Sequence, residues 1–519
     1  MNRRKFLRLA AAIPAAAWAR RADAGSQAPA IVTAPNAKPS MPFGVTAGDV
    51  GGGRAIVWSR CDRAARMFVE FSTTERFGDP RRVRGPAATD ATDFTSRTVL
   101  TDLPQGQRIF YRVIYQDLSD LRTWSEPITG TFTTPSATPR DVTLAWSADT
   151  VGQGWGINPE WGGLRLYETM RRAQPDVFVN VGDTIYADQP LVAEVKLDDG
   201  RVWKNVVTEA KSKVAESLGE FRGCYQYNLG DEHMRRFIAE VPQIVMWDDH
   251  EVRDNWYWER RNDADARYKE KSVAVLAARA RQAFFEYNPL PLAGDDPERV
   301  YRSIPMGPLL EVFALDMRTF KGANGANRQA AMDDASAVLG RAQLQWLKAG
   351  LQRSRAVWKV VAADLPLGLI VGDGAGRYEA VANDEAGMPL GRELEIADLL
   401  AFLRRARVRN VVWITADVHY CAAHEYHPAR ARFTTFDPFW EFVAGPLHAG
   451  TFGPGRLDAT FGPQAKFVGI PPGMKGNRPP SDGHQFFGTL RANAKTRTLT
   501  ARLHNLAGQV IYTNELAPA

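Results

Sequence analysis

The chain has 519 residues, of which 45% are hydrophobic and 24% charged, and its formal net charge is +6. This composition is typical of a globular protein, and the length allows two or more domains. The three cysteines, Cys61, Cys224 and Cys421, are odd in number and widely spaced, which excludes a disulfide framework and a cysteine zinc site.

Residues 1–24 have the pattern of a twin-arginine export signal, with Arg3 and Arg4 before an apolar run and small residues near Ala24. The alternatives are an ordinary basic N-terminus or a membrane anchor, but the apolar run is shorter than the ~20 residues of a spanning helix. We therefore expect the twin-arginine export machinery as a partner, and a periplasmic or secreted location. Removal of residues 1–24 leaves a net charge of +1. The net charge therefore supports no argument for a nucleic-acid or membrane partner.

Residues 25–40 are rich in Ala, Pro, Ser, Gly and Asn and are predicted to be a linker. Alternating hydrophobic and polar residues then predict short strands separated by Gly, Pro and Asp. These strands are 55–60, 67–71, 96–100, 108–115 and 129–133. Their number and spacing predict a small N-terminal β-sandwich domain over 41–135, similar to a fibronectin or immunoglobulin-like domain.

A second domain, 140–519, is predicted after a Pro-containing hinge, because strands there alternate with helical segments. The predicted strands are 141–147, 176–181, 242–247, 309–316, 358–363 and 410–415, with three more in 485–516. The predicted helices are 160–172, 272–285, 341–353 and 391–405. This order indicates an α/β or α+β core. No later run is long and apolar enough to predict a transmembrane segment.

Four short polar clusters each follow an apolar strand, where α/β proteins tend to place their active-site side chains. They are Ala148-Asp149-Thr150, Gly182-Asp183-Thr184-Ile185-Tyr186, Asp248-Asp249-His250-Glu251 and Ala416-Asp417-Val418-His419. A single aspartate after a strand is usually a turn or helix-cap residue. Four such clusters in succession instead predict one site that binds hard or borderline metal ions.

Two ions suit these clusters, because several carboxylates brought together without cations would repel one another or become protonated. Two ions about 3.5–4 Å apart can neutralise the carboxylates and clamp a phosphate group. Tyr186 lies close to Asp183 in sequence, and a phenolate ligand suits ferric iron. His250 directly follows Asp249, so it can face a leaving group while Asp249 binds metal.

The order of these motifs resembles the PhoD-like phosphatases, within the wider calcineurin-like and purple-acid metallophosphoesterases. Residues 43–49 and 56–60 resemble the opening of that family's N-terminal β-domain, so the resemblance spans nearly the whole chain. It implies a metallophosphoesterase β-sandwich core flanked by helices. Many family members have Cys where this chain has Asp149, which leaves open which metal is bound.

The resemblance also implies residue roles. Asp183 would bridge two ions; Asp149, Tyr186 and His419 would complete an iron (Fe³⁺) site; Asp249 and Asp417 would hold a second ion, calcium in the best-known members. His250 would contact phosphate and act as general acid. Asn255 near the second ion and Asp364, which follows the strand 358–363, are tentative further ligands.

The implied activity is that of an alkaline phosphatase D-like enzyme, which hydrolyses phosphomonoesters, phosphodiesters or both by attack of a metal-bound hydroxide. Two alternatives stay open: a phospholipase D-like enzyme that acts on phospholipids, and a non-catalytic binding protein with a degenerate site. Tryptophans near the motifs, such as Trp155 and Trp256, would contact an acyl group or belong to the core. The Gly- and Pro-rich stretch 445–480 is expected to be either a mobile flap or a surface loop.

Overall fold

The structure, a computed structural model, describes residues 37–519. The predicted signal, 1–24, and most of the predicted linker, 25–36, lie outside the described residues, and 37–40 have no regular secondary structure. Residues Pro39–Ala519 form one unit by their internal contacts. Within 37–519 no helix combines the length and apolar character that a membrane span needs.

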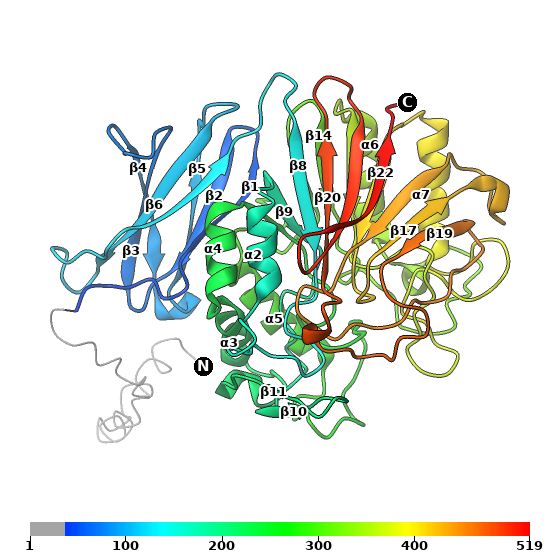
Figure 1. The fold of residues 1–519 in the computed structure, drawn as a ribbon, viewed down its shortest axis with the longest axis horizontal. Helices are drawn as coiled ribbons and strands as arrows, with labels where there is room; N and C mark the ends of the chain where they lie inside the picture. Colours follow the sequence, from blue (N-terminus) through cyan, green and yellow to red (C-terminus); the bar gives the residue numbers. More distant parts are fainter. Residues whose placement is uncertain (1–36) are drawn as a thin grey trace, which may run out of the picture. The chain divides into compact units, whose positions relative to one another are not determined.

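Two large sheets make up the core (Figure 1). The nine-stranded sheet has the order β22 (Val510–Leu516), β21 (Leu499–Asn505), β20 (Phe486–Ala492), β8 (Val142–Ser147), β9 (Val177–Asn180), β12 (Gln243–Val245), β1 (Val45–Gly51), β2 (Arg54–Arg60), β5 (Thr95–Leu100). The seven-stranded sheet has the order β13 (Arg302–Pro305), β14 (Leu310–Ala314), β15 (Trp358–Ala362), β16 (Val411–Thr415), β18 (Phe439–Val443), β17 (Ala422–Tyr426), β19 (Pro463–Val468).

The sheets face each other across a shared apolar core, in which Leu144 and Val179 of one sheet pack with Val312 and Ile414 of the other. The opposite face of each sheet carries helices, because strand side chains alternate between faces. Ala145, for example, belongs to the core cluster under the helices α2 (Arg165–Arg172), α3 (Leu218–Leu229), α4 (Glu232–Glu240) and α5 (Val273–Tyr287). Helices α6 (Gly340–Arg353) and α7 (Glu393–Arg405) cover the seven-stranded sheet.

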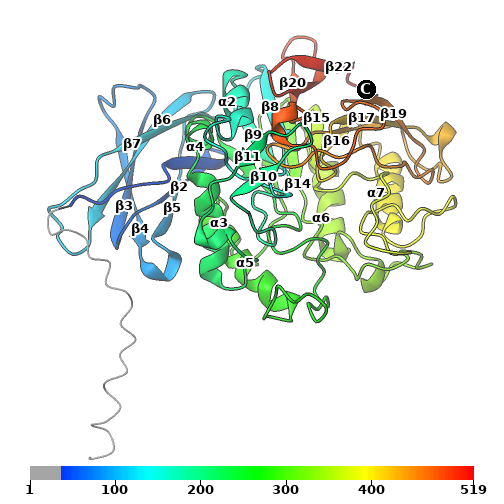
Figure 2. The ribbon, with the colours of Figure 1, turned by 60° about the horizontal axis from the view of Figure 1, so that its bottom comes forward.

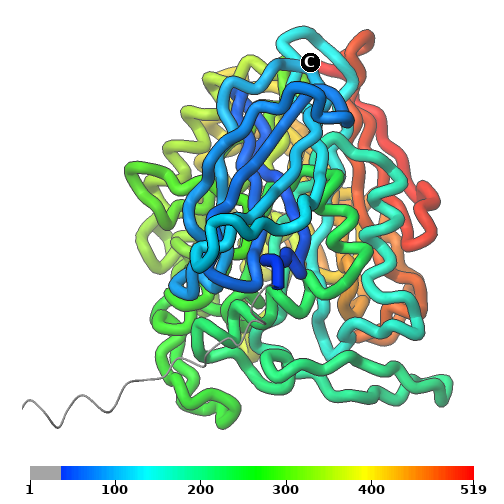
Figure 3. The backbone as a smooth tube through the Cα atoms, turned by 90° about the vertical axis from the view of Figure 1, so that its left-hand side faces the viewer, coloured from blue at the N-terminus to red at the C-terminus, as the bar shows by residue number. Residues whose placement is uncertain are grey.

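The N-terminal strands are divided between two sheets (Figures 2 and 3). A four-stranded sheet has the order β4 (Arg81–Ala88), β3 (Ala65–Ser72), β6 (Arg108–Asp117), β7 (Ile128–Thr133). It packs through its apolar face on β1, β2 and β5. Those three strands continue the nine-stranded sheet, because β1 pairs in parallel with β12. A small hairpin, β10 (Glu194–Lys196) and β11 (Val202–Lys204), stands apart from these sheets.

Most predicted strands and helices are present within one to three residues of their expected ends. The helix expected from residue 160 begins only at Arg165, because Gly162 and Gly163 adopt positive φ angles that interrupt helical backbone. Helix α3 was not predicted, although Ser217 and Glu220 form a capping box at its start. The strands β17, β18 and β19 were also missed.

Candidate metal centre

The four polar clusters lie at one edge of the sandwich. Asp149 follows β8, Asp183 follows β9, and Asp249 follows β12, and these three strands are parallel neighbours. Asp417 and His419 follow β16 in the facing sheet. The carboxyl ends of strands from both sheets therefore converge, which brings the predicted ligands together.

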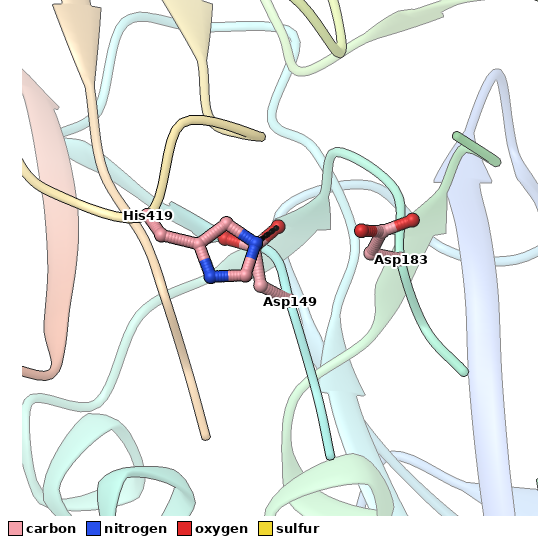
Figure 4. A group of neighbouring side chains, drawn as sticks. All are labelled: Asp149, Asp183 and His419. Carbon is pink, nitrogen blue, oxygen red and sulfur yellow. Dashed lines mark ion pairs between the residues drawn. The ribbon is translucent and has the colours of Figure 1, made fainter. Parts of the chain in front are cut away.

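Three groups of side chains place their ligand atoms within 4.8 Å of one another. These are Asp149, Asp183 and His419, shown in Figure 4; Asp183, Asp249 and His250; and Asp248, Asp249 and Asp417. Asp183 is common to the first two groups and Asp249 to the last two. The arrangement is that of adjacent centres joined through shared carboxylates.

The backbone at these positions is unusual. Asp149, Asp183, Asn255, Asp417 and His419 all have φ between 48° and 66°, the left-handed region that non-glycine residues seldom adopt. Such conformations cluster at functional sites, because surrounding structure must hold them against their cost. Here all five positions lie in the loops that surround the site.

The donor set fits cations. Both carboxylate oxygens of Asp149 and Oδ1 of Asp249 are buried and have no hydrogen-bond partner. Burial first, and then neighbouring carboxylates, raise the pKa of Asp149, Asp183 and Asp417 well above the usual aspartate range. Bound cations reverse this effect and satisfy the free oxygens, so these residues are suited to hold metal ions.

His419 is held as a neutral ligand. Its Nδ1 donates a hydrogen bond to the Gly450 carbonyl at 2.6 Å, so the unprotonated Nε2 faces the site. Burial lowers the pKa of His419 to about 3. Nε2 lies 3.8 Å from Asp149 Oδ1 and 2.9 Å from the Tyr186 hydroxyl. Burial raises the pKa of Tyr186 well above its usual value, and so do Asp183 and Asp149, so the phenol ionises only against a cation.

His250 is oriented by a residue that sequence analysis missed. Its Nδ1 donates to Asp188 Oδ1 at 2.7 Å, and its Nε2 lies 3.9 Å from both Asp249 and Asp254. Burial opposes the charged imidazolium, but Asp188, Asp249 and Asp183 outweigh it and raise the pKa of His250 well above its usual value. Asp188 follows Asp183 by five residues and lies on no strand end, so no periodic pattern marked it.

Glu251 ties the loops of the nine-stranded sheet together. Its carboxylate accepts backbone hydrogen bonds from Asp183 at 3.2 Å, Thr184 at 2.6 Å and Asp248 at 2.7 Å. The loops after β9 and β12 are thereby joined through one fully buried side chain. Sequence analysis had included Glu251 in its cluster without giving it a role.

A buried guanidinium spans the two sheets. Arg318, which follows β14, is fully buried, and its Nε lies 2.6 Å from Asp248 and 2.8 Å from Asp364. It also pairs with Glu379, and its Nη2 is 3.6 Å from Asp417. Asp364, a tentative ligand, therefore faces Arg318 and belongs to none of the three metal-binding groups found among residues 37–519. Arg318 lies just beyond a strand end, the same signal that marked the four clusters.

Asn255 lies beside the site. Its backbone N–H donates to Asp249 Oδ2, which leaves Oδ1 of that carboxylate without a partner. Its side-chain amide nitrogen donates to Asp373 at 3.3 Å. The amide oxygen is therefore the end of this side chain that is available to a ligand.

A cavity of about 280 Å³ opens over these residues. Asp183, Asp249, His250, Asp417 and His419 line its polar side, and Leu369, Ile370, Val371, Tyr420 and Phe452 add apolar and aromatic walls. The stretch 445–480 thus reaches the cavity through Phe452, whose ring centroid is 5.5 Å from that of His419. Trp155 and Trp256 are buried, so they belong to the core.

Comparison with known proteins places this geometry in a family. The PhoD-like phosphatase family matches residues 144–503, and its N-terminal domain matches 26–136. The chain is 27% identical over 279 residues to alkaline phosphatase D of Bacillus subtilis (strain 168), which covers 52% of this chain and 45% of that protein. The match thus spans less than half of that relative.

Two solved structures share the fold of paired sheets flanked by helices. A structure of PhoD has a TM-score of 0.67 at 19% identity and covers 92% of this chain and 93% of its own. Purple acid phosphatase PPD1 from yellow lupin (Lupinus luteus) seeds has a TM-score of 0.54 at 12% identity, and the match covers 92% of this chain and 74% of that structure's chain. The metallophosphoesterase-like fold predicted from the sequence is confirmed, and the chain belongs to the PhoD-like phosphatase family.

Proposed function

We propose that the protein is a metal-dependent phosphoric ester hydrolase of the alkaline phosphatase D type. The observation that carries this proposal is the set of buried carboxylate oxygens without partners beside a neutral His419, under a cavity that His250 also lines. Such a set holds cations next to a position where a phosphate group fits. Family membership supports the same reaction class.

The proposed ligands are taken mainly from the three groups, and Tyr186 is added because its hydroxyl lies 2.9 Å from His419 Nε2. Asp183 would be shared by two ions, of which Asp149, Tyr186 and His419 would hold the first and Asp249 and Asp417 the second. Ferric iron in the first position suits the Tyr186 phenolate and the His419 imidazole; calcium in the second suits an all-oxygen set. Asn255 is a further candidate for the second ion, through its amide oxygen. Asp364 is the weakest candidate, because its carboxylate already pairs with Arg318.

Ions bound here supply positive charge that polarises the phosphate and lowers the pKa of a nearby water. The residues of the chain then have separate tasks. His250, held by Asp188 at Nδ1, directs Nε2 toward the cavity and donates a proton to the departing ester oxygen. The walls formed by Leu369, Ile370 and Phe452 limit the access of bulk water. No serine or cysteine nucleophile is required.

We also propose that 1–24 direct export by the twin-arginine route to the periplasm or beyond, and that 25–40 link this signal to the enzyme. The basis is the Arg3-Arg4 pair and the apolar run that follows. A β-sandwich domain of immunoglobulin type over 41–135, and a catalytic domain over 140–519, complete the proposed organisation. The apolar core between the four-stranded sheet and β1, β2 and β5 supports the first of these domains.

The activity is tested with p-nitrophenyl phosphate, bis-p-nitrophenyl phosphate and phosphatidylcholine, each assayed before and after chelation and metal return. We expect metal-dependent release from at least one p-nitrophenyl ester. Hydrolysis of phosphatidylcholine alone would favour a phospholipase D-like enzyme. No hydrolysis of any of the three by metal-loaded protein would favour a binding protein.

Asp183→Asn should lose both ions and all hydrolysis, because one carboxylate is shared by two groups. The measurement is elemental analysis of the purified variant beside the wild type. Asp120→Asn, which changes a half-buried acid in the loop after β6, is the matched control and should keep full metal content. Full metal content in Asp183→Asn would exclude the bridging role.

Tyr186→Phe should abolish a broad visible absorption band, because among the proposed ligands only the phenolate gives visible charge transfer to ferric iron. The wild-type spectrum and the iron content of both proteins are measured together. Iron retained without the band identifies Tyr186 as its source. A colourless and fully active wild type would mean that iron is not the metal.

Asp188→Asn should shift the loss of activity at high pH toward lower pH. The carboxylate of Asp188 is the largest influence that raises the pKa of His250, and a general acid must be protonated, so a lower pKa removes the acid sooner as pH rises. The amide oxygen still accepts from Nδ1, so metal content should not change.

His250→Ala should cost ~10²–10⁴ in rate on alkyl phosphates and much less on p-nitrophenyl esters. An unshifted pH profile in Asp188→Asn, or an equal loss on both ester types in His250→Ala, contradicts the acid role.

A further inference from the structure

A concentration of positive charge lies at the other end of the sandwich from the metal centre. The segment 353–359 carries three cationic residues, 404–410 carries four and 495–497 carries two, and none of the three contains an acid. Since residues 25–519 together have a net charge of +1, this is a strong local excess.

The three segments are adjacent in space. The backbone N–H of Lys359 donates to Asn410 O at 2.9 Å, and the Trp358 indole donates to Arg497 O at 2.7 Å. Together they line a polar groove of about 520 Å³, beside the chain end marked C in Figure 1. Lys359, Arg407, Arg409 and Arg497 contribute to its walls.

Few carboxylates compensate this charge. Arg409 pairs with Asp437 at 2.6 Å, and Glu311, the acid nearest Lys359, bonds the Ser354 hydroxyl. Among residues 37–519 the other cations of the three segments have no ion-pair partner within 4.0 Å. Ala519, the last residue of the sequence, also lines the groove, so one further carboxylate lies beside these cations. The groove therefore offers an excess of positive charge to an anion.

An apolar crevice of about 320 Å³ adjoins the basic groove. It lies between the end of α7 and the starts of β16 and β18, with Trp358, Leu403, Phe439 and Trp440 among its walls. Val408, Arg409, Asn410 and Ala519 line both spaces, so the polar groove and the apolar crevice meet along the segment 408–410 and the last residue of the sequence.

We propose that this end of the protein docks on a bilayer that contains anionic phospholipid, with headgroup phosphates in the basic groove and part of one acyl chain in the crevice. Charge complementarity selects the headgroup, and the adjoining apolar space distinguishes a lipid from an anionic polymer. The segments 353–357 and 405–410 precede β15 and β16, whereas Asp364 and Asp417 follow those strands. Docking therefore leaves the metal centre facing away from the membrane.

The test uses the full metal-loaded protein and sedimentation with phosphatidylcholine vesicles that either contain or lack phosphatidylglycerol. We expect binding only to the vesicles with phosphatidylglycerol, weakening as salt is raised. Equal binding to both vesicles, or to neither, overturns the proposal. Displacement of the protein from vesicles by sn-glycerol phosphate, added at the concentration of accessible lipid, also overturns the proposal. A free headgroup has no acyl chain for the crevice, so it should compete poorly with lipid.

Arg407→Glu with Arg497→Glu should weaken vesicle binding by about thirtyfold or more, since each basic residue at an anionic surface contributes about fivefold. The matched control reverses two exposed arginines of the N-terminal strands that have no ion pair, Arg76→Glu with Arg84→Glu, and should bind like the wild type. Val408→Glu places a charge where the two spaces meet and should reduce binding with every cation intact.

Hydrolysis of a soluble ester should be unchanged in all three variants, which separates lost docking from lost folding. Wild-type binding by Arg407→Glu/Arg497→Glu, or by Val408→Glu, overturns the proposal.

Discussion

The structure depends on the crowding of acidic side chains in a space that excludes water. Asp149, Asp183, Asp248, Asp249 and Asp417 lie against one another at the meeting point of two sheets, most of them fully buried. Burial disfavours their ionised forms and mutual repulsion adds to the cost, so the arrangement is stable as a charged group only with compensating cations. The oxygens of Asp149 that lack partners show where that compensation is missing from the protein itself.

The protein compensates part of this charge with its own groups, and it does so selectively. Arg318 forms ion pairs with Asp248, Asp364 and Glu379, and Glu251 is held by backbone N–H donors. Asp149 and the Oδ1 atom of Asp249 receive nothing comparable. The difference separates the acids that Arg318 pairs with from those that have no guanidinium beside them, although Asp248 and Asp364 each keep one buried oxygen without a hydrogen-bond partner. It also explains why Asp364, placed at a strand end like the proposed ligands, has a structural partner.

The two site histidines have opposite protonation behaviour, although both are buried within the same cluster. His419 donates Nδ1 to a neutral carbonyl and so stays neutral, with Nε2 suited to metal binding. His250 donates Nδ1 to the Asp188 carboxylate, which favours the protonated ring. One hydrogen-bond partner, a carbonyl or a carboxylate, thus separates a ligand from a candidate acid. The basic groove lies at the far end of the sandwich, away from both histidines.

The sequence by itself determined which strands end in the acidic and histidine clusters, because hydrophobic runs followed by Asp and His are local patterns. It also determined the family and most strand positions. Only the tertiary structure decided that β1, β2 and β5 extend the central sheet, that Asp188 orients His250, and that Arg318 pairs with Asp364. These features join residues 46 to 195 positions apart, such as Arg318 with Asp364 and Gly48 with Gln243. Periodicity and spacing describe neighbours along the chain, whereas the partner of a buried charge is set by how the two sheets pack.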